Sequence, residues 1–273
     1  MIKLFSQSAT KGLGACLYFH LLFLGCLICQ QAEAAQERWQ DPDYILSSFI
    51  EIALKNEFDA DTGQIRKWTS PVNVWLDHRV GEQNLHTRLV TLQLNELSRI
   101  TGHPISLVSS KNQANVVVIF TRFEDMAELS QQLINSKAAG SLREGTLCVF
   151  KIQADKNQAI HHATIIIPVD QAQMSGQLVS CIVEELTQVL GLVNDSEKVY
   201  PSIFNDKTPN ALLTGLDYLL LRILYDSRLK PGMHTEEVKV IVRNIIKEMI
   251  KSGEVDNAWQ MVKESELYPL LGY

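Results

Sequence analysis

The sequence predicts an α/β fold in which helices cover a mixed, mostly parallel sheet. Short apolar strands alternate with amphipathic helices from residue 41 onward, and strands joined through crossover helices pair in parallel. The run from Asn115 to Phe120 is almost continuously apolar, which is typical of a strand buried on both faces. Charged helical segments near the C-terminus predict a helical extension that packs on this sheet domain.

The first 34 residues predict a secretory signal peptide. Lys3 and Lys11 give a cationic start, an apolar run extends from Leu17 to Cys29, and Ala32-Glu33-Ala34 forms a small-x-small cleavage site. A membrane anchor is the alternative, but the run is shorter than the ~20 residues that a spanning helix needs. A lipoprotein signal is a second alternative, although Phe23-Leu24-Gly25-Cys26 has a bulky residue before its glycine.

We divide the chain into a signal peptide (1–34), an α/β domain (35–230) and a C-terminal helical extension (231–273). The signal holds two of the 25 basic and one of the 31 acidic residues, so the mature chain carries a net charge of −7. With no basic stripe, nucleic acid is not expected as a partner. We expect a periplasmic or extracellular protein that meets the membrane only through its signal or a lipid anchor.

Helix and strand signals follow one another through the first half of the chain. Asp41-Pro42 opens the first helix, because aspartate caps a helix start and proline suits its first turn. Apolar periodicity then predicts a strand at 71–77, a helix at 85–100, strands at 105–108 and 115–120, and a polar helix at 123–135.

The second half begins with two further strands and ends in helices. The pattern predicts strands at 146–152 and 162–168, a helix at 175–190, an irregular stretch at 193–212 and a helix at 214–225. Thr214 and Asp217 form a capping box with aspartate in place of glutamate. Pro231-Gly232 breaks the chain before two last helices at 235–251 and 255–264.

Two cysteines remain after the signal, Cys148 and Cys181. Two cysteines in an exported protein predict one disulfide. Two buried free thiols are the alternative, because the distance between the two cysteines decides whether a disulfide can form.

The helix predicted at 175–190 carries the most informative polar residues. Leu178, Ile182, Leu186 and Val189 share one face, and Cys181, Glu184, Glu185 and Gln188 share another. Consecutive glutamates are costly if they are buried without partners. This face therefore meets solvent in a groove or finds donors nearby, or it is an ordinary solvated helix face.

Residues 181–195 resemble the active-site helix of metzincins, whose pattern is H-E-x-x-H-x-x-G-x-x-H. In that frame Glu184, Gln188 and Asn194 take the three histidine positions, Glu185 takes the general-base position and Gly191 the glycine position.

The flanking sequence supports the same resemblance. Ser202 to Asn205 is similar to the methionine-containing turn of metzincins, with Phe204 at the methionine position, and Leu213 to Tyr225 is similar to the closing helix of matrix-type metalloproteases. The resemblance covers about residues 70–226 and implies a metzincin-like fold, with the strand order strand, helix, strand, strand, edge strand, strand, active-site helix. More closely, the chain looks like an uncharacterised family of exported proteobacterial proteins, some described as lipoproteins.

The replaced ligands change the expected chemistry. Zinc prefers imidazole or thiolate donors, and a neutral amide oxygen is a poor substitute, so zinc is not expected and no cofactor is assigned. Carboxylate and amide oxygens suit calcium better, and Asn194-Asp195 and Asn205-Asp206 offer such donors.

We expect a non-catalytic binding or interaction module of the cell envelope whose partner is a protein or peptide. Its predicted binding residues are Glu184, Gln188, Asn194, Asp195, Asn205 and Asp206. The first alternative is a peptidase-like hydrolase with an atypical site of Glu184, Glu185 and Gln188, in which Glu185 is the general base and Glu184 a ligand or acid. The second is an envelope-assembly subunit without a small-ligand site.

Overall fold

A computed structural model describes residues 38–55, 63–134, 147–207 and 210–272 of the chain. Two compact units are present, Met1–Asp41 and Pro42–Tyr273. The described part of the first unit contains one short 3-10 helix, η1 (Arg38–Gln40). The predicted signal peptide, residues 1–34, lies outside the described residues. In the part of the chain that is described, no helix is both long and apolar enough to cross a membrane.

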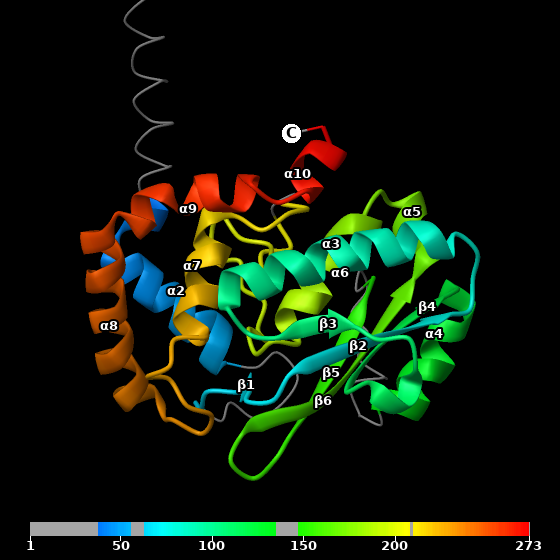
Figure 1. Cartoon of the computed structure of the whole chain (residues 1–273), viewed down its shortest axis with the longest axis horizontal. Helices are drawn as coiled ribbons and strands as arrows, with labels where there is room; N and C mark the ends of the chain where they lie inside the picture. Colours follow the sequence, from blue (N-terminus) through cyan, green and yellow to red (C-terminus); the bar gives the residue numbers. More distant parts are fainter. Residues whose placement is uncertain (1–37, 56–62, 135–146, 208–209, 273) are drawn as a thin grey trace, which may run out of the picture. The chain divides into compact units, whose positions relative to one another are not determined.

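A six-stranded sheet forms the centre of the second unit (Figure 1). Its strands are β1 (Lys67–Trp68), β2 (Val72–His78), β3 (Ile105–Leu107), β4 (Val116–Thr121), β5 (Val149–Ala154) and β6 (Ala159–Pro168). The order is β1-β6-β4-β2-β3 with every pair parallel, and β5 pairs antiparallel with β6. The predicted α/β fold with a mostly parallel mixed sheet is therefore confirmed.

Strand β4 lies between β2 and β6, which explains its unbroken apolar sequence. On one face of the sheet, Ile119 and Ile166 pack with Met126 and Leu129 of helix α4 (Phe123–Leu129). On the other face, Phe120 stacks against His86 of helix α3 (Gln83–Thr101). Helices therefore cover both faces, as continuous apolar strands require.

The remaining helices have the bounds η2 (Lys111–Gln113), η3 (Ser130–Ile134), α2 (Pro42–Leu54), α5 (Val169–Met174), α6 (Leu178–Gln188), α7 (Gly215–Leu224), α8 (Thr235–Ser252), α9 (Glu254–Lys263) and α10 (Leu267–Leu270). The α2 start at Pro42 and the α3 end before left-handed Gly102 agree with the sequence signals.

Several boundaries differ from the sequence expectation. The polar helix expected at 123–135 is α-helical only to Leu129, and a π turn continues to Ile134. The helix expected from residue 175 begins at Leu178, because the short α5 precedes it and Gly176 adopts a positive φ of 71°. The two-residue strand β1, helix α5 and helix α10 were not predicted, since segments this short carry no measurable periodicity.

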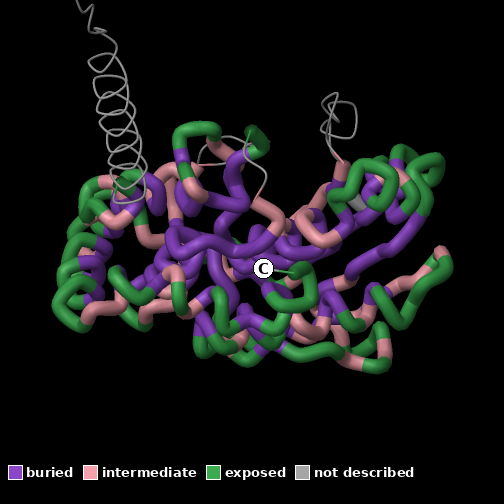
Figure 2. The backbone as a smooth tube through the Cα atoms, turned by 90° about the horizontal axis from the view of Figure 1, so that it is seen from above, coloured by how far each residue is buried: buried purple, intermediate pink, exposed green. Residues whose placement is uncertain are grey.

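The C-terminal helices pack on the earlier helices of the same unit. Helix α8 contacts α2, and α9 contacts α7. Their inward side chains are apolar, for example Val242 and Ile246 of α8, which are fully or almost fully buried. Figure 2 shows buried stretches running through the interior while exposed residues follow the outer turns.

Candidate functional site

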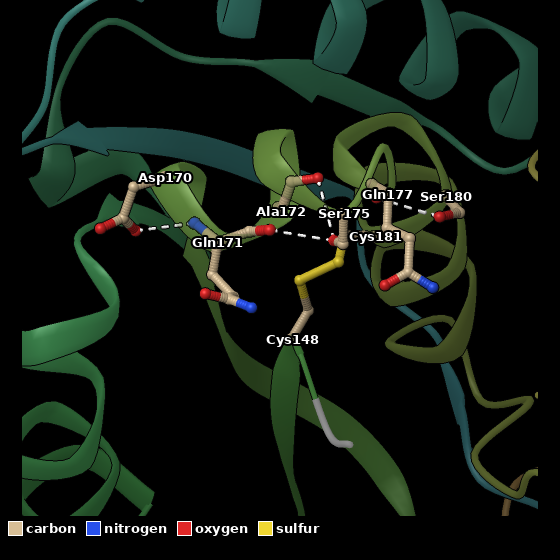
Figure 3. The surroundings of a disulfide bond; sticks show 8 residues. All are labelled: Cys148, Asp170, Gln171, Ala172, Ser175, Gln177, Ser180 and Cys181. Atoms are coloured by element: carbon tan, nitrogen blue, oxygen red, sulfur yellow. Dashed lines mark hydrogen bonds between the residues drawn. A yellow bond between two sulfur atoms is a disulfide. The ribbon is translucent and has the colours of Figure 1, made fainter.

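The predicted disulfide joins Cys148 and Cys181, with a Cα–Cα distance of 5.9 Å (Figure 3). Cys148 immediately precedes strand β5, and Cys181 lies in the first turn of α6. The disulfide therefore fastens the start of edge strand β5 to helix α6. Backbone hydrogen bonding continues around it, since the Cys181 amide donates to the Gln177 carbonyl at 2.9 Å.

Three carboxylates gather one turn further along α6. An oxygen from each of Glu184, Asp195 and Asp206 lies within 4.8 Å of the others, and we call these three residues the acidic cluster. Glu184 and Asp195 are half-buried and Asp206 is exposed. In the described residues, this is the one group of three or more histidine, cysteine or acidic side chains with such geometry.

Gln188 supports the acidic cluster by donating from Nε2 to Oδ1 of Asp195 at 2.7 Å. Its side chain is only 2 % exposed, so it acts from beneath the cluster. Glu184 and Gln188 thus lie on the same side of α6 as Cys181, as the helical spacing predicts.

Asn194, at the third ligand position of the metzincin frame, is directed elsewhere. Its side-chain amide donates to the Glu51 carbonyl of α2 at 3.0 Å, and its backbone amide donates to Ile52 at 3.2 Å. The neighbouring Asp195 takes the place beside Glu184. The frame positions are therefore divided between the acidic cluster and a contact with α2.

These donors do not fit zinc. The acidic cluster consists of carboxylates, and zinc sites in proteins are built mainly from imidazole and thiolate with one open position. Hard cations such as calcium prefer oxygen donors. Glu185, at the general-base position, is 5 % exposed and therefore does not face solvent in this conformation.

Four of the histidines after the predicted signal contact groups outside the acidic cluster. His103 contacts the Ser70 carbonyl at 2.8 Å, and His234 contacts Gln64 at 2.9 Å. His78 and His86 stack with Phe120, with ring centroids 5.3 Å and 4.4 Å from the phenyl ring.

The loop that brings Asp195 and Asp206 to Glu184 is held by buried polar side chains. Asn205, 3 % exposed, donates to the carbonyls of Glu197 (3.2 Å) and Val199 (2.9 Å), and its own oxygen accepts the Lys207 amide. Asn205 therefore organises this loop through its side-chain amide. These bonds fix the backbone on both sides of Asp206.

Asp217 fastens the other end of the same loop. It is fully buried and completes the predicted capping box with Thr214 at the start of α7. Ser202 donates its hydroxyl to Asp217 at 2.6 Å, and the Ile203 amide donates at 3.1 Å. Burial raises the pKa of Asp217 to about 6, although the donors from Ser202 and Thr214 oppose that shift.

The turn after α6 requires glycine. Gly191 has a φ of 121°, and a Cβ at this position would lie 2.1 Å from the Arg66 carbonyl oxygen. The preceding carbonyls are capped by aromatic donors: Trp68 Nε1 donates to Val189 at 2.8 Å, and the Tyr225 hydroxyl donates to Leu190 at 3.0 Å. The positive φ and the close approach of the Arg66 backbone together leave no room for a side chain at this position.

Lys67 is a structural cation that sequence reasoning missed. It is 7 % exposed, and its Nζ donates to three carbonyls, that of Leu224 at the end of α7 (2.7 Å) and those of Asp226 (3.3 Å) and Leu229 (3.2 Å) beyond it. Burial lowers its pKa to about 8. A lysine before a tryptophan gives no sequence signal for this role, because the acceptors come from more than 150 residues away.

A family model described as "Protein of unknown function (DUF2927)" matches residues 42–244. Comparisons with curated proteins and with solved structures find no match. The match spans most of the chain, so the chain belongs to the DUF2927 family.

Proposed function

We propose that this DUF2927 protein is an exported, non-catalytic binding module that holds an extended polypeptide segment between edge strand β5 and the polar side of α6. The observation that carries the proposal is the position of the acidic cluster. Cys181 links α6 to the residue before β5, and Glu184 follows Cys181 by one helical turn, about 5 Å along the axis.

Strand β5 supplies a backbone surface for such a segment. Of the described strands, only β6 pairs with it, and an added strand would pair along its second edge. Its residues are mostly half-buried, which suits contact with an alternating apolar and polar segment.

The acidic cluster supplies selectivity. Three carboxylates within 4.8 Å of one another attract a lysine or arginine side chain, which forms charge-assisted hydrogen bonds with them. The hydrogen bond from Gln188 restrains Asp195. The hydrogen bonds of Asn205 restrain the neighbouring chain at Asp206, so the acceptor oxygens are held in place before binding.

Peptidase ancestry without hydrolysis is consistent with this arrangement. The order β2, α3, β3, β4, β5, β6, α6 follows the order of elements that the metzincin resemblance implies, with β5 as the edge strand. The imidazole donors are replaced, and Glu185 is buried. The disulfide supports export, because disulfides persist in oxidising compartments.

Metal analysis and peptide cleavage separate this proposal from a hydrolase. We expect elemental analysis of the purified protein to give far less than one zinc per chain, and a mixed peptide substrate to remain intact with or without a chelator. Stoichiometric zinc, or cleavage that is lost in a folded Glu185→Gln variant, would instead establish a peptidase.

Binding is tested with peptides selected from a displayed random library against the wild-type protein. We expect the selected peptides to contain lysine or arginine and to bind the folded Glu184→Gln/Asp195→Asn variant at least about tenfold more weakly, a loss of about 1.4 kcal/mol. Glu237→Gln on α8 is the matched charge control and should leave affinity unchanged. Equal affinity for all three proteins would refute the proposal, and calorimetric binding of calcium alone to the acidic cluster would point to a cation site.

A further inference from the structure

The carboxyl ends of strands β2, β4 and β6 carry three exposed apolar side chains. Leu85 in the first turn of α3 is 40 % exposed, Phe123 at the start of α4 is 52 % exposed, and Met174 at the end of α5 is 76 % exposed. Figure 1 shows α5 and the first turns of α3 and α4 at the same end of the sheet. We call Leu85, Phe123 and Met174 the apolar patch.

Hydrogen bonds through α5 connect the elements that carry the patch. Asp170 at the start of α5 accepts the Phe123 amide at 2.9 Å, and Gln173 Nε2 reaches Glu82, just before α3, at 3.5 Å. Met174 follows Gln173 in α5, and Leu85 lies three residues after Glu82. The two contacts therefore bring the segments that carry all three apolar residues together at one end of the sheet.

A small ligand has little room to enter the sheet beneath this surface. In open α/β sheets, ligands bind beyond the carboxyl ends of the strands where the strand order reverses. Here that position lies between β2 and β4, since β3 and β4 flank β2 on opposite sides. The rings of His78, His86 and Phe120 fill it, with centroids 4.4 to 5.8 Å apart, and His86 is fully buried.

Acidic side chains surround the patch. Glu82, Glu124, Asp125, Glu128 and Asp170 are exposed on the same segments. Three arginines are exposed there, and two of them, Arg79 and Arg122, form ion pairs with Asp77 and Glu124. Arg88 is the third, and it stands against the four remaining acidic side chains. The negative excess favours a partner with basic groups at its periphery.

We propose that the apolar patch is a docking surface for an amphipathic segment of another protein, in which apolar side chains are flanked by lysine or arginine. Apolar contacts with Phe123 and Met174 supply the centre of the interface, and the acidic rim orients the segment. Anionic lipid and a second copy of the same acidic surface are both disfavoured as occupants by like-charge repulsion. This surface is separate from the acidic cluster on α6 and does not depend on its role.

The direct test measures binding of a labelled synthetic helical peptide of leucine and lysine that has one apolar face. We expect Phe123→Ser/Met174→Ser to weaken binding at least about tenfold. The control, Val240→Ser/Ile250→Ser, removes two exposed apolar side chains from α8 (63 % and 43 % exposed) and should leave binding unchanged. Thermal unfolding checks that both variants fold. We expect them to fold because the substituted side chains are exposed.

Two further measurements identify the occupant. Glu124→Gln/Asp125→Asn/Glu128→Gln should weaken binding and reduce its dependence on salt, and a peptide of the same composition with scrambled order should bind at least about tenfold more weakly. Glu184→Gln/Asp195→Asn should have no effect, whereas loss of binding in that variant alone would place the peptide at α6 and overturn the proposal. The proposal would also be overturned if Phe123→Ser/Met174→Ser left the affinity for the peptide unchanged. It would likewise be overturned if the wild-type protein bound anionic vesicles, or formed a dimer, and this variant lost that binding or that dimer.

Discussion

Two buried polar regions of this protein are organised in opposite ways. In the loop between α6 and α7, Asn194, Asn205 and Asp217 are all buried, and each donates or accepts hydrogen bonds that fix the backbone. At the carboxyl ends of β2 and β4, His86 is completely buried, yet neither ring nitrogen finds a hydrogen-bond partner among the described residues. The first region is held by directional bonds and the second by ring stacking.

The difference shows what each region can tolerate. A backbone fixed by several buried hydrogen bonds keeps the acidic cluster in place but has little room for substitution. A stacked, neutral histidine is stable only while it remains uncharged, because no acceptor is available for a second ring proton. Substitutions should therefore damage the α6–α7 loop most, and acid should damage the histidine stack most.

The largest effect is expected for Gly191→Ala. The new Cβ would lie 2.1 Å from the Arg66 carbonyl oxygen, and the φ of 121° is strained for alanine. We expect the free energy of unfolding to fall by about 4 kcal/mol or more, measured by denaturant titration. Gly81→Ala is the control, since nothing lies within 4 Å of its added Cβ and its loss should be below about 1 kcal/mol. Equal losses would show that the turn after α6 adapts freely.

Removal of the disulfide should follow. The cysteines are 33 residues apart, and closing a loop of this length stabilises the folded state by about 3–4 kcal/mol in the chain-entropy model. We expect Cys148→Ala/Cys181→Ala to lower the free energy of unfolding by that amount when measured without reductant. Dithiothreitol should lower the wild-type value similarly and leave the variant unchanged. A stable variant with unchanged peptide binding would mean that α6 and β5 hold together without the bond.

The stability of the fold should depend on the acceptor oxygens of Asp217 rather than on its charge. Asp217→Ala leaves the Ser202 hydroxyl and the Ile203 and Thr214 amides without their acceptor, and we expect a loss of about 3 kcal/mol. Asp217→Asn keeps one acceptor oxygen, so its loss should be clearly smaller. Chemical unfolding of both variants checks the order, and equal losses would assign the effect to the charge.

The smallest effect, confined to acid, should come from the histidine stack. Burial lowers the pKa of His86 and of His78 below the usual value near 6.5, so the unfolded chain takes up protons that the folded chain resists. The two neutral histidines therefore make their full contribution to the stability of the fold above about pH 6.5. As the pH falls, the free energy of unfolding declines by up to about 1.4 kcal/mol per pH unit for each histidine. His86→Phe should flatten this decline when unfolding is measured from pH 7.5 to 5.

The charged groups around the stack act on this prediction. Glu82 opposes the His86 shift and Asp77 opposes the His78 shift, while Arg79 neutralises Asp77. Asp217 contributes with the opposite sign, because its raised pKa makes its stabilising contribution complete below about pH 4 and lost as the pH rises through about 6. Measuring His86→Phe in an Asp217→Asn background separates the two, and an unchanged pH profile would show that the stack is not responsible.

Much of the secondary structure could be predicted from the sequence because its signals are local. The alternation in β2, the apolar run of β4 and the Thr214–Asp217 capping box depend on residues close together in the chain, and all three are present in the structure. The disulfide could be predicted from the number of cysteines after the signal and the expectation of export alone. The short α5 and the stacking of His86 on Phe120 lacked any such local pattern.

The sequence by itself determined the α/β class, the order of its longer elements and which face of α6 is polar, because periodicity and capping are properties of neighbouring residues. Only the tertiary structure decided that Asp195 and Asp206 join Glu184 while Asn194 turns to α2, and that the segments carrying Leu85, Phe123 and Met174 meet at one end of the sheet. The physical reason is that loop paths and strand order set these distances. Both depend on contacts between residues far apart in the chain.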